Sequence, residues 1–133
     1  MSRLVLDASA AVRLILGHPA VAPEIFERLA ASAPVLAPHL YYTEVANALW
    51  KYVRAGALTE QQAIDRFGEA RELISRTVED ATLLEEAISV AARHNHPVYD
   101  TLYAVLARRN SCPVLTMDKR LKSLLDGMVV DRV

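Results

Sequence analysis

Two acidic residues in this chain stand where a buried strand gives way to a helix. Asp7 follows the apolar residues 4–6 and precedes a dense apolar stretch that ends at Gly17, which is the pattern of a strand leading into a helix. Asp118 repeats this arrangement after residues 114–117. Ligands bind outside the carboxyl ends of the strands in open α/β sheets. We therefore expect both carboxylates at one edge of a parallel sheet.

Two further acids extend this set to four. Asp100 opens an apolar helix, and Glu44 lies inside another helix among apolar residues. Taken singly, each Asp could be a plain helix N-cap, and Glu44 an exposed helix residue. Four carboxylates together would be a costly gathering of like charge, which a divalent ion such as Mg²⁺ or Mn²⁺ would offset. Zinc is disfavoured because the chain has one cysteine, Cys112, and because His94 and His96 flank a helix break and are expected to face solvent.

The elements that must position these acids alternate along the chain. Thr59 and Gln62 form the pattern of a capping box, and Asp80 is a candidate N-cap for the helix that follows it. The alternation predicts one α/β domain over residues 1–133, with three α/β/α layers and a central parallel sheet of four or five strands. The expected strands are residues 4–6, 34–38, 77–78, 113–116 and 128–130, and the expected helices are residues 10–16, 21–31, 40–54, 60–74, 81–93, 100–110 and 118–125.

The composition is that of a globular protein with a well-filled core. Of the 133 residues, 53% are hydrophobic and 23% are charged, which argues against disorder. No apolar run approaches the roughly 20 residues of a membrane span, and only three residues precede the first strand, so we expect no membrane segment and no signal peptide. We expect a cytoplasmic protein in which the single Cys112 is a small buried hydrophobe.

The net charge of −1 does not exclude a nucleic acid as partner. If four of the 16 acids bind a metal, 12 remain against 15 Lys and Arg, which leaves +3 outside the site. The cations in the last third of the chain could bind a nucleic acid or could simply form a solvated surface, and the sequence leaves both interpretations open. The last third of the chain holds Arg93, Arg108, Arg109, Lys119, Arg120 and Lys122.

Four short segments together resemble a known family. The residues around the four acids read Leu-Asp-Ala-Ser at 6–9, Thr-Glu-Val-Ala-Asn-Ala-Leu at 43–49, Tyr-Asp-Thr-Leu-Tyr-Ala at 99–104 and Thr-Met-Asp-Lys-Arg-Leu at 116–121. In this order and spacing they resemble the PIN-domain nucleases. More narrowly, the chain resembles the toxin ribonuclease of a VapBC-type toxin–antitoxin pair.

The resemblance implies a site and a reaction. Asp7, Glu44, Asp100 and Asp118 would bind Mg²⁺ or Mn²⁺ and would be the catalytic residues for hydrolysis of RNA phosphodiester bonds. It also implies helper roles for the hydroxyls of two residues beside the first and last acids, Ser9 and Thr116.

A third helper follows from spacing. Asn47 lies three residues after Glu44 on the same helix face, so it could orient Glu44 or touch substrate. For all three helpers an ordinary cap or surface hydrogen bond remains the alternative.

Other functions remain open at this point. The same fold could be a binding module whose acids are only caps, or a stand-alone RNA-processing nuclease. An aspartyl-phosphate phosphatase is disfavoured, because that chemistry calls for an Asp two residues after Asp7 and Ser9 stands there.

The expected partners also come from the resemblance. It implies a small antitoxin protein that covers the site, and a toxin homodimer. Aromatic residues gather on the helix over residues 40–54, which suits either an interface or the core; they are Tyr41, Tyr42, Trp50 and Tyr52.

Overall fold

The computed structural model describes residues 2–17 and 22–133. Its centre is a four-stranded sheet in the order β3-β2-β1-β4, in which every pair of neighbours is parallel. Leu4, Val5 and Leu6 of β1 are fully buried, as a strand covered on both faces should be. This confirms the predicted strands at 4–6, 34–38, 77–78 and 113–116, apart from shifts at their ends. The strands are β1 (Ser2–Leu6), β2 (Ser32–Pro38), β3 (Arg76–Val78) and β4 (Val114–Leu115).

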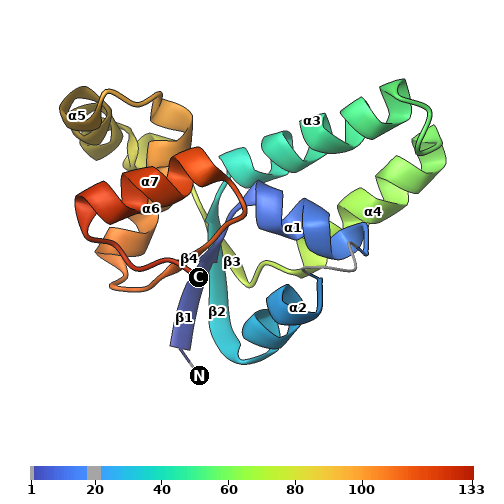
Figure 1. Cartoon of the computed structure of the whole chain (residues 1–133), viewed down its shortest axis with the longest axis horizontal. Helices are drawn as coiled ribbons and strands as arrows, with labels where there is room; N and C mark the ends of the chain where they lie inside the picture. The colour runs from blue at the N-terminus through green and yellow to red at the C-terminus, as the bar shows by residue number, and fades with distance from the viewer. Residues whose placement is uncertain (1, 18–21) are drawn as a thin grey trace.

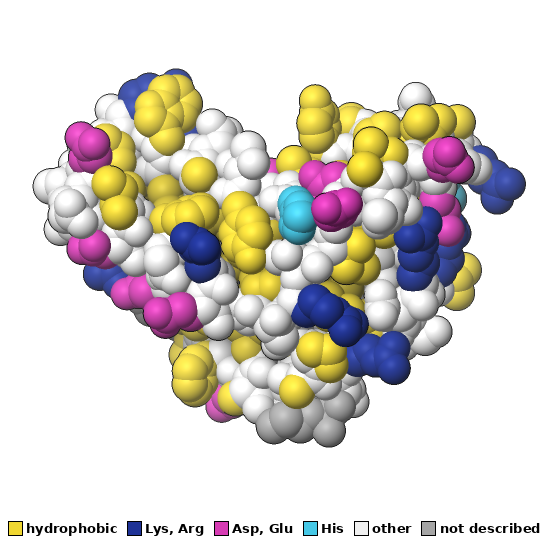
Figure 2. Space-filling model, turned by 180° about the vertical axis from the view of Figure 1, so that it is seen from behind, with side chains coloured by type: hydrophobic (Ala, Val, Ile, Leu, Met, Phe, Trp, Pro, Cys, Tyr) yellow, Lys and Arg dark blue, Asp and Glu magenta, His cyan; other side chains and the backbone are white. Residues whose placement is uncertain are grey.

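Helices cover both faces of the sheet (Figure 1), which confirms the three-layer α/β/α architecture. On one face lie α1 (Ala8–Ile15), α2 (Ala22–Ala30), α3 (Leu40–Arg54) and α4 (Glu60–Glu72), and on the other lie α5 (Leu84–His94), α6 (Val98–Arg109) and α7 (Lys119–Met128). Seen from behind, the two groups of helices form two lobes with a notch between them (Figure 2). None of the described helices is both long and apolar enough to cross a bilayer.

Several local predictions hold. α3 spans the predicted residues 40–54, and α4 starts with the predicted capping box, in which the Thr59 hydroxyl accepts from Gln62 N–H while the Gln62 side chain accepts from Thr59 N–H. Cys112 is buried, as expected of a small hydrophobe. The helix predicted over 21–31 is α2, although its first predicted residue lies outside the described residues.

The predicted strand over residues 128–130 is wrong. α7 continues to Met128, and Val129 ends it in the left-handed conformation with φ 58°. The N–H groups of Val129 and Val130 then donate to carbonyls of the last turn, Asp126 and Leu125, so they satisfy the helix end instead of a sheet. The chain returns to the sheet only afterwards, at a single parallel bridge between Arg132 and Val114.

Two helix starts differ from the predicted ones. Asp80 does not cap α5; its carboxylate accepts from Leu40 N–H at 3.1 Å, so it anchors the start of α3, and a short 3₁₀ turn (Asp80–Thr82) precedes α5. α6 begins at Val98 directly after Pro97, which places Asp100 in its first turn and not at its cap. Proline has no backbone N–H, and this is tolerated at Pro97 because the first N–H groups of a helix have no intrahelical partner.

The aromatic residues of α3 divide between core and surface. Tyr41 is fully buried, whereas Trp50 and Tyr52 are 51% and 42% exposed. The Tyr41 hydroxyl donates to the Ala70 carbonyl of α4 at 2.8 Å. This carbonyl lies in the last turn of α4, where it also accepts a longer bond from Leu73 N–H at 3.3 Å. The Tyr41 bond therefore joins α3 to α4 and adds a second donor to a carbonyl at the end of α4.

Replacing Tyr41 by Phe should lower the free energy of unfolding by about 1–3 kcal/mol, because it leaves a buried carbonyl with a weaker set of partners. Chemical denaturation of the purified variant measures this. Tyr42→Phe is the matched control, because Tyr42 is only partly buried and packs against the Tyr41 and Phe67 rings through its ring edge or face. Equal stability of Tyr41→Phe and Tyr42→Phe would contradict the assigned role of the bond.

Candidate active site

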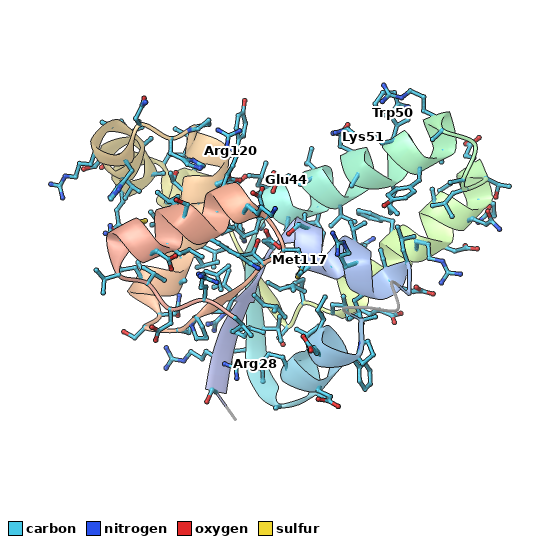
Figure 3. All side chains as sticks on the ribbon, viewed as in Figure 1. Arg28, Glu44, Trp50, Lys51, Met117 and Arg120 are labelled. Carbon is cyan, nitrogen blue, oxygen red and sulfur yellow. The ribbon has the colours of Figure 1, made fainter. Side chains whose placement is uncertain are left out.

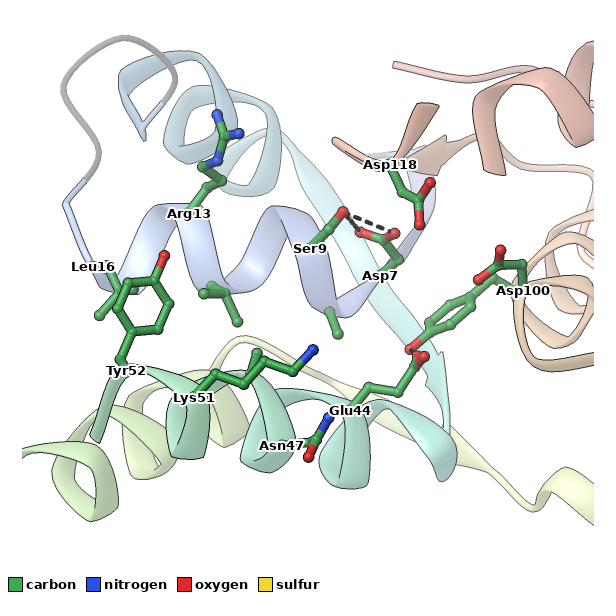
Figure 4. A pocket seen from close by; sticks show the side chains of 14 residues that line it. Asp7, Ser9, Arg13, Leu16, Glu44, Asn47, Lys51, Tyr52, Asp100 and Asp118 are labelled. Atoms are coloured by element: carbon green, nitrogen blue, oxygen red, sulfur yellow. Dashed lines mark hydrogen bonds between the residues drawn. The ribbon is translucent and has the colours of Figure 1, made fainter. Parts of the chain in front are cut away.

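The four predicted acids line one pocket between the lobes, although they are spread over 112 positions of the chain. The pocket has a volume of about 450 Å³ and lies against α1 and α3 (Figure 4). Asp7 and Asp118 come from the N-caps of α1 and α7, Asp100 from the first turn of α6, and Glu44 from α3. Glu44 stands at the gap between α3 and the opposite lobe (Figure 3). The structure thus brings the four acids to one pocket, as the sequence predicts.

Pairing of β1 with β4 brings the first and last acids together. Leu6 is the partner of Leu115 in the sheet, and Asp7 N–H donates to the Leu115 carbonyl at 3.2 Å. Asp7 and Thr116 therefore leave the sheet at the same level. This is the juxtaposition expected from two strands that each end at an acid.

The Asp7 carboxylate is buried in a network of donors. Its Oδ1 accepts from Ala10 N–H at 3.0 Å, and the Ser9 hydroxyl lies 2.8 Å from Oδ1 and 3.0 Å from Oδ2. The Thr116 hydroxyl donates to Oδ2. Burial outweighs these bonds and raises the pKa of Asp7 to about 6, with a smaller contribution from the charge of Asp118.

Ser9 and Thr116 also fix the backbone around the last acid. The Ser9 hydroxyl accepts from Met117 N–H at 2.9 Å, and the Thr116 hydroxyl accepts from Asp118 N–H at 3.0 Å. Asp118 in turn uses its Oδ1 to accept from the N–H groups of Arg120 and Leu121 at 2.8 and 3.3 Å. Two hydroxyls thus tie the end of β1 to the start of α7.

Glu44 is held from the opposite lobe. The Tyr103 hydroxyl of α6 donates to its Oε1 at 2.6 Å. Burial raises the pKa of Glu44 to about 7 against this bond, and the charges of Asp100, Asp7 and Asp118 add to the rise. Asn47 lines the same pocket, but no hydrogen bond joins these two described side chains, so an orienting contact to Glu44 is not present.

Asp100 faces a histidine that was expected in solvent. The His96 side chain is only 11% exposed, and its Nε2 lies 3.5 Å from Asp100 Oδ2. The turn at Asn95, with φ 50°, ends α5 and places His96 at the start of α6, so that prediction is wrong for His96; His94 is exposed as expected. Burial raises the pKa of Asp100, as does Asp118, while His96 and Arg120 act in the opposite direction.

The four carboxylates face the pocket without closing into a coordination shell. Within the part of the chain that the structure describes, no three His, Cys, Asp or Glu side chains stand ready to hold an ion. The donor set nevertheless suits a hard cation, because the lining includes four carboxylates with no His or Cys. A bound ion would require side-chain rotation toward the centre of the pocket.

The predicted site residues do not include four polar residues of the pocket. Tyr103 lies one turn after Asp100 on α6, Arg13 one turn after Ser9 on α1, and Lys51 one turn after Asn47 on α3, so helical spacing from each predicted site residue was the available signal. The sequence predicts Tyr52 only as an interface or core residue of the helix over residues 40–54. All four line the pocket together with the acids.

The raised pKa of Asp7 has a consequence for stability. An acid whose pKa is about 6 when folded and 3.8 in its reference state favours folding less as the pH rises through this interval. In EDTA, the free energy of unfolding of Asp7→Asn relative to that of the natural chain should therefore rise by about 2 kcal/mol between pH 4 and pH 7.5. Denaturation at a series of pH values measures it.

Asp65→Asn is the control, because Asp65 lies on α4 where its carboxylate accepts from the exposed Gln61 side chain. A difference between Asp7→Asn and the natural chain that stays constant over this pH range would show that burial does not penalise the Asp7 carboxylate.

Comparison with known proteins places this pocket in a family. The PIN domain family model matches residues 4–125. Ribonuclease VapC3 of Pyrobaculum aerophilum is 34% identical over 130 residues, which cover 96% of this chain and 98% of that protein. Ribonuclease VapC1 of Mycobacterium tuberculosis is 34% identical over 121 residues, 91% of this chain and 90% of that protein.

Solved structures share the fold. The crystal structure of PAE2754 from Pyrobaculum aerophilum superposes with a TM-score of 0.77 at 24% identity, covering 99% of this chain and 84% of that one. VapC20 of Mycobacterium tuberculosis, described as a toxin that cleaves the sarcin–ricin loop, gives a TM-score of 0.67 at 17% identity over 90% of this chain and 93% of that one. With a family model that spans most of its length and two relatives at 34% identity, this chain belongs to the PIN domain family.

Proposed function

We propose that this protein is a metal-dependent endoribonuclease that hydrolyses RNA phosphodiester bonds and serves as the toxin of a type II toxin–antitoxin pair. The observation that carries the proposal is the meeting of Asp7, Glu44, Asp100 and Asp118 in one pocket of a PIN domain. The relatives named Ribonuclease VapC, at 34% identity over almost the whole chain, support RNA as the substrate.

The proposed cofactor is Mg²⁺ or Mn²⁺, held by these four carboxylates. Burial and mutual repulsion raise the pKa values of Asp7, Glu44 and Asp100, and both penalties would be relieved by a divalent cation. When bound, such an ion supplies charge neutralisation at the phosphate and activation of a water molecule.

The chain's own residues would hold the reacting groups in place. Asp7 is fixed by Ala10 N–H and by the hydroxyls of Ser9 and Thr116, and Glu44 is fixed by Tyr103. Because these donors come from α1, from α6 and from the residue directly after β4, they restrict the carboxylates to positions set by the packed core. The proposed supporting role of Ser9 and Thr116 is therefore to orient Asp7. Asn47, on the pocket wall, is proposed to contact substrate.

Asp7→Asn and Asp100→Asn should each reduce Mg²⁺- or Mn²⁺-dependent cleavage of RNA by about 10²-fold or more, because each removes a negative oxygen from the proposed metal site. The assay is cleavage of a labelled RNA with metal and then with EDTA, with circular dichroism to confirm folding. Titration calorimetry with Mn²⁺ gives a second measurement, in which affinity should fall in both variants.

Asp65→Asn is again the matched control and should retain full cleavage. Full turnover in both site variants would refute the proposed mechanism. A natural chain with no measurable affinity for Mg²⁺ or Mn²⁺ would favour a non-catalytic binding module instead.

The proposed protein partners are a small antitoxin that covers the site and a second copy of the toxin, acting in the cytoplasm. Structural neighbours described as VapBC-1 of nontypeable Haemophilus influenzae and FitAcB of Neisseria gonorrhoeae, with TM-scores of 0.65 and 0.61, support the antitoxin. An apolar surface between α3 and α4 supports a protein interface, since its large members Trp50 and Ile64 are 51% and 57% exposed. Figure 2 shows hydrophobic side chains reaching the surface over this lobe.

Light scattering on the purified protein without antitoxin should give twice the mass of the chain. Trp50→Glu and Ile64→Glu should shift this mass toward the monomer, because each places a charge in the apolar surface. Glu85→Lys on the opposite lobe is the control and should leave the mass unchanged. A monomer in the natural protein would refute the homodimer while leaving the proposed nuclease activity untouched.

A further inference from the structure

The pocket extends beyond the four acids along α1 and α3. From α1 it is lined by Ala8, Val12 and Leu16 at helical spacing, and from α3 by Ala48, Lys51 and Tyr52. The rise from Glu44 to Lys51 along α3 is about 10 Å. The acids therefore occupy one end of a groove about two helical turns long, and different chemistry occupies the other end (Figure 4).

We propose that this far end binds the nucleotide next to the cleaved bond, with Lys51 on its phosphate and Tyr52 stacked on its base. This proposal rests on the proposed nuclease function and specifies which residues would bind one nucleotide of the RNA substrate. Arg13, on the α1 rim of the same pocket, adds a second positive charge for the strand.

The groove has carboxylates at one end and the cationic side chains of Lys51 and Arg13 farther along. Lys51 extends from α3 into the pocket in Figure 4, toward the side occupied by Asp7 and Ser9. Within the described residues, however, neither Lys51 nor Arg13 forms an ion pair with a carboxylate. A lysine that served only to neutralise the acids would be in contact with them. Its ammonium group is instead available to an anion placed along the groove, such as a phosphate of the strand.

The surface beside Lys51 suits a nucleobase. Val12, Leu16 and Ala48 give this part of the groove an apolar wall, and the Tyr52 ring is 42% exposed at its end. Figure 4 shows the Tyr52 and Leu16 side chains at the end of the pocket farthest from Asp100. A cation followed by an exposed aromatic ring matches the alternation of phosphate and base in a single strand better than it matches a peptide.

The experiment measures RNA binding in the Asp7→Asn background, so that cleavage does not interfere. The probe is a short RNA whose cleavage site has first been mapped with the natural protein. Adding Lys51→Ala should weaken binding and make the dependence of log K on log salt shallower by about 0.7, because one phosphate contact is lost. Adding Tyr52→Ala should weaken binding about 5- to 150-fold, whereas Tyr52→Phe should retain it, since the ring alone stacks.

The base contact has an independent test. An RNA that lacks the base of the nucleotide on one side of the cleaved bond should bind more weakly than the intact RNA to the Asp7→Asn protein. In the protein that also carries Tyr52→Ala, the two RNAs should bind equally well, because the stacking contact is already lost. Arg54→Ala is the matched control on the same helix: the Arg54 guanidinium lies over the Trp50 ring, at 4.6 Å from its centroid, and outside the pocket. It should leave RNA binding unchanged.

The outcomes separate this inference from the proposed function. If the natural protein cleaves RNA with metal but Lys51→Ala and Tyr52→Ala bind RNA as tightly as their parent, the subsite is refuted and the nuclease stands. If these changes weaken binding of a cognate antitoxin and leave RNA binding intact, the groove is a peptide site and the inference is likewise overturned. Absence of metal-dependent cleavage in the natural protein would instead refute the proposed function.

Discussion

The buried carboxylate of Asp7 is the constraint on which the site depends. It is 4% exposed and accepts hydrogen bonds from a backbone N–H and two hydroxyls, yet burial still raises its pKa to about 6. The donors are thus too few to offset the loss of hydration. A carboxylate that is buried although burial lowers the stability of the fold is typical of a functional site.

The parallel sheet makes this arrangement possible. β1 lies between β2 and β4, and the chain leaves both β1 and β4 at the same edge, so Asp7 and Thr116 meet although 109 residues separate them. Helices from both layers then complete the pocket: α3 supplies Glu44 from one lobe, and α6 supplies Asp100 and Tyr103 from the other. Because the Tyr103–Glu44 bond crosses between lobes, it couples the two layers at the site itself.

Local patterns in the sequence were enough for the strands, most helices and the acids that follow strands. They failed where a distant contact decides the outcome. Asp80 is of a residue type that often caps helices, but its carboxylate accepts a hydrogen bond from Leu40 N–H, 40 residues away. His96 follows a helix break in the sequence, but in the fold its ring lies beside Asp100 of α6. The apolar residues around Val130 resemble a strand, yet their N–H groups close the end of α7. Lys51 and Tyr103 were within reach of helical spacing, but spacing alone does not show which face meets a pocket.

Helix capping and metal binding were alternatives for the acids, but in this fold they are compatible. A carboxylate has two oxygens, and Asp118 uses Oδ1 to cap α7 while no cap bond involves Oδ2. At Asp7 the Ser9 hydroxyl is shared between both oxygens, at 2.8 and 3.0 Å, so rotation about one bond can satisfy Oδ1 and release Oδ2 from that donor. The cap thus fixes where the carboxylate stands, and the remaining lone pairs leave capacity for a cation. The cap bonds of Asp7 and Asp118 therefore position two carboxylates of the proposed metal site, and capping is no argument against metal binding.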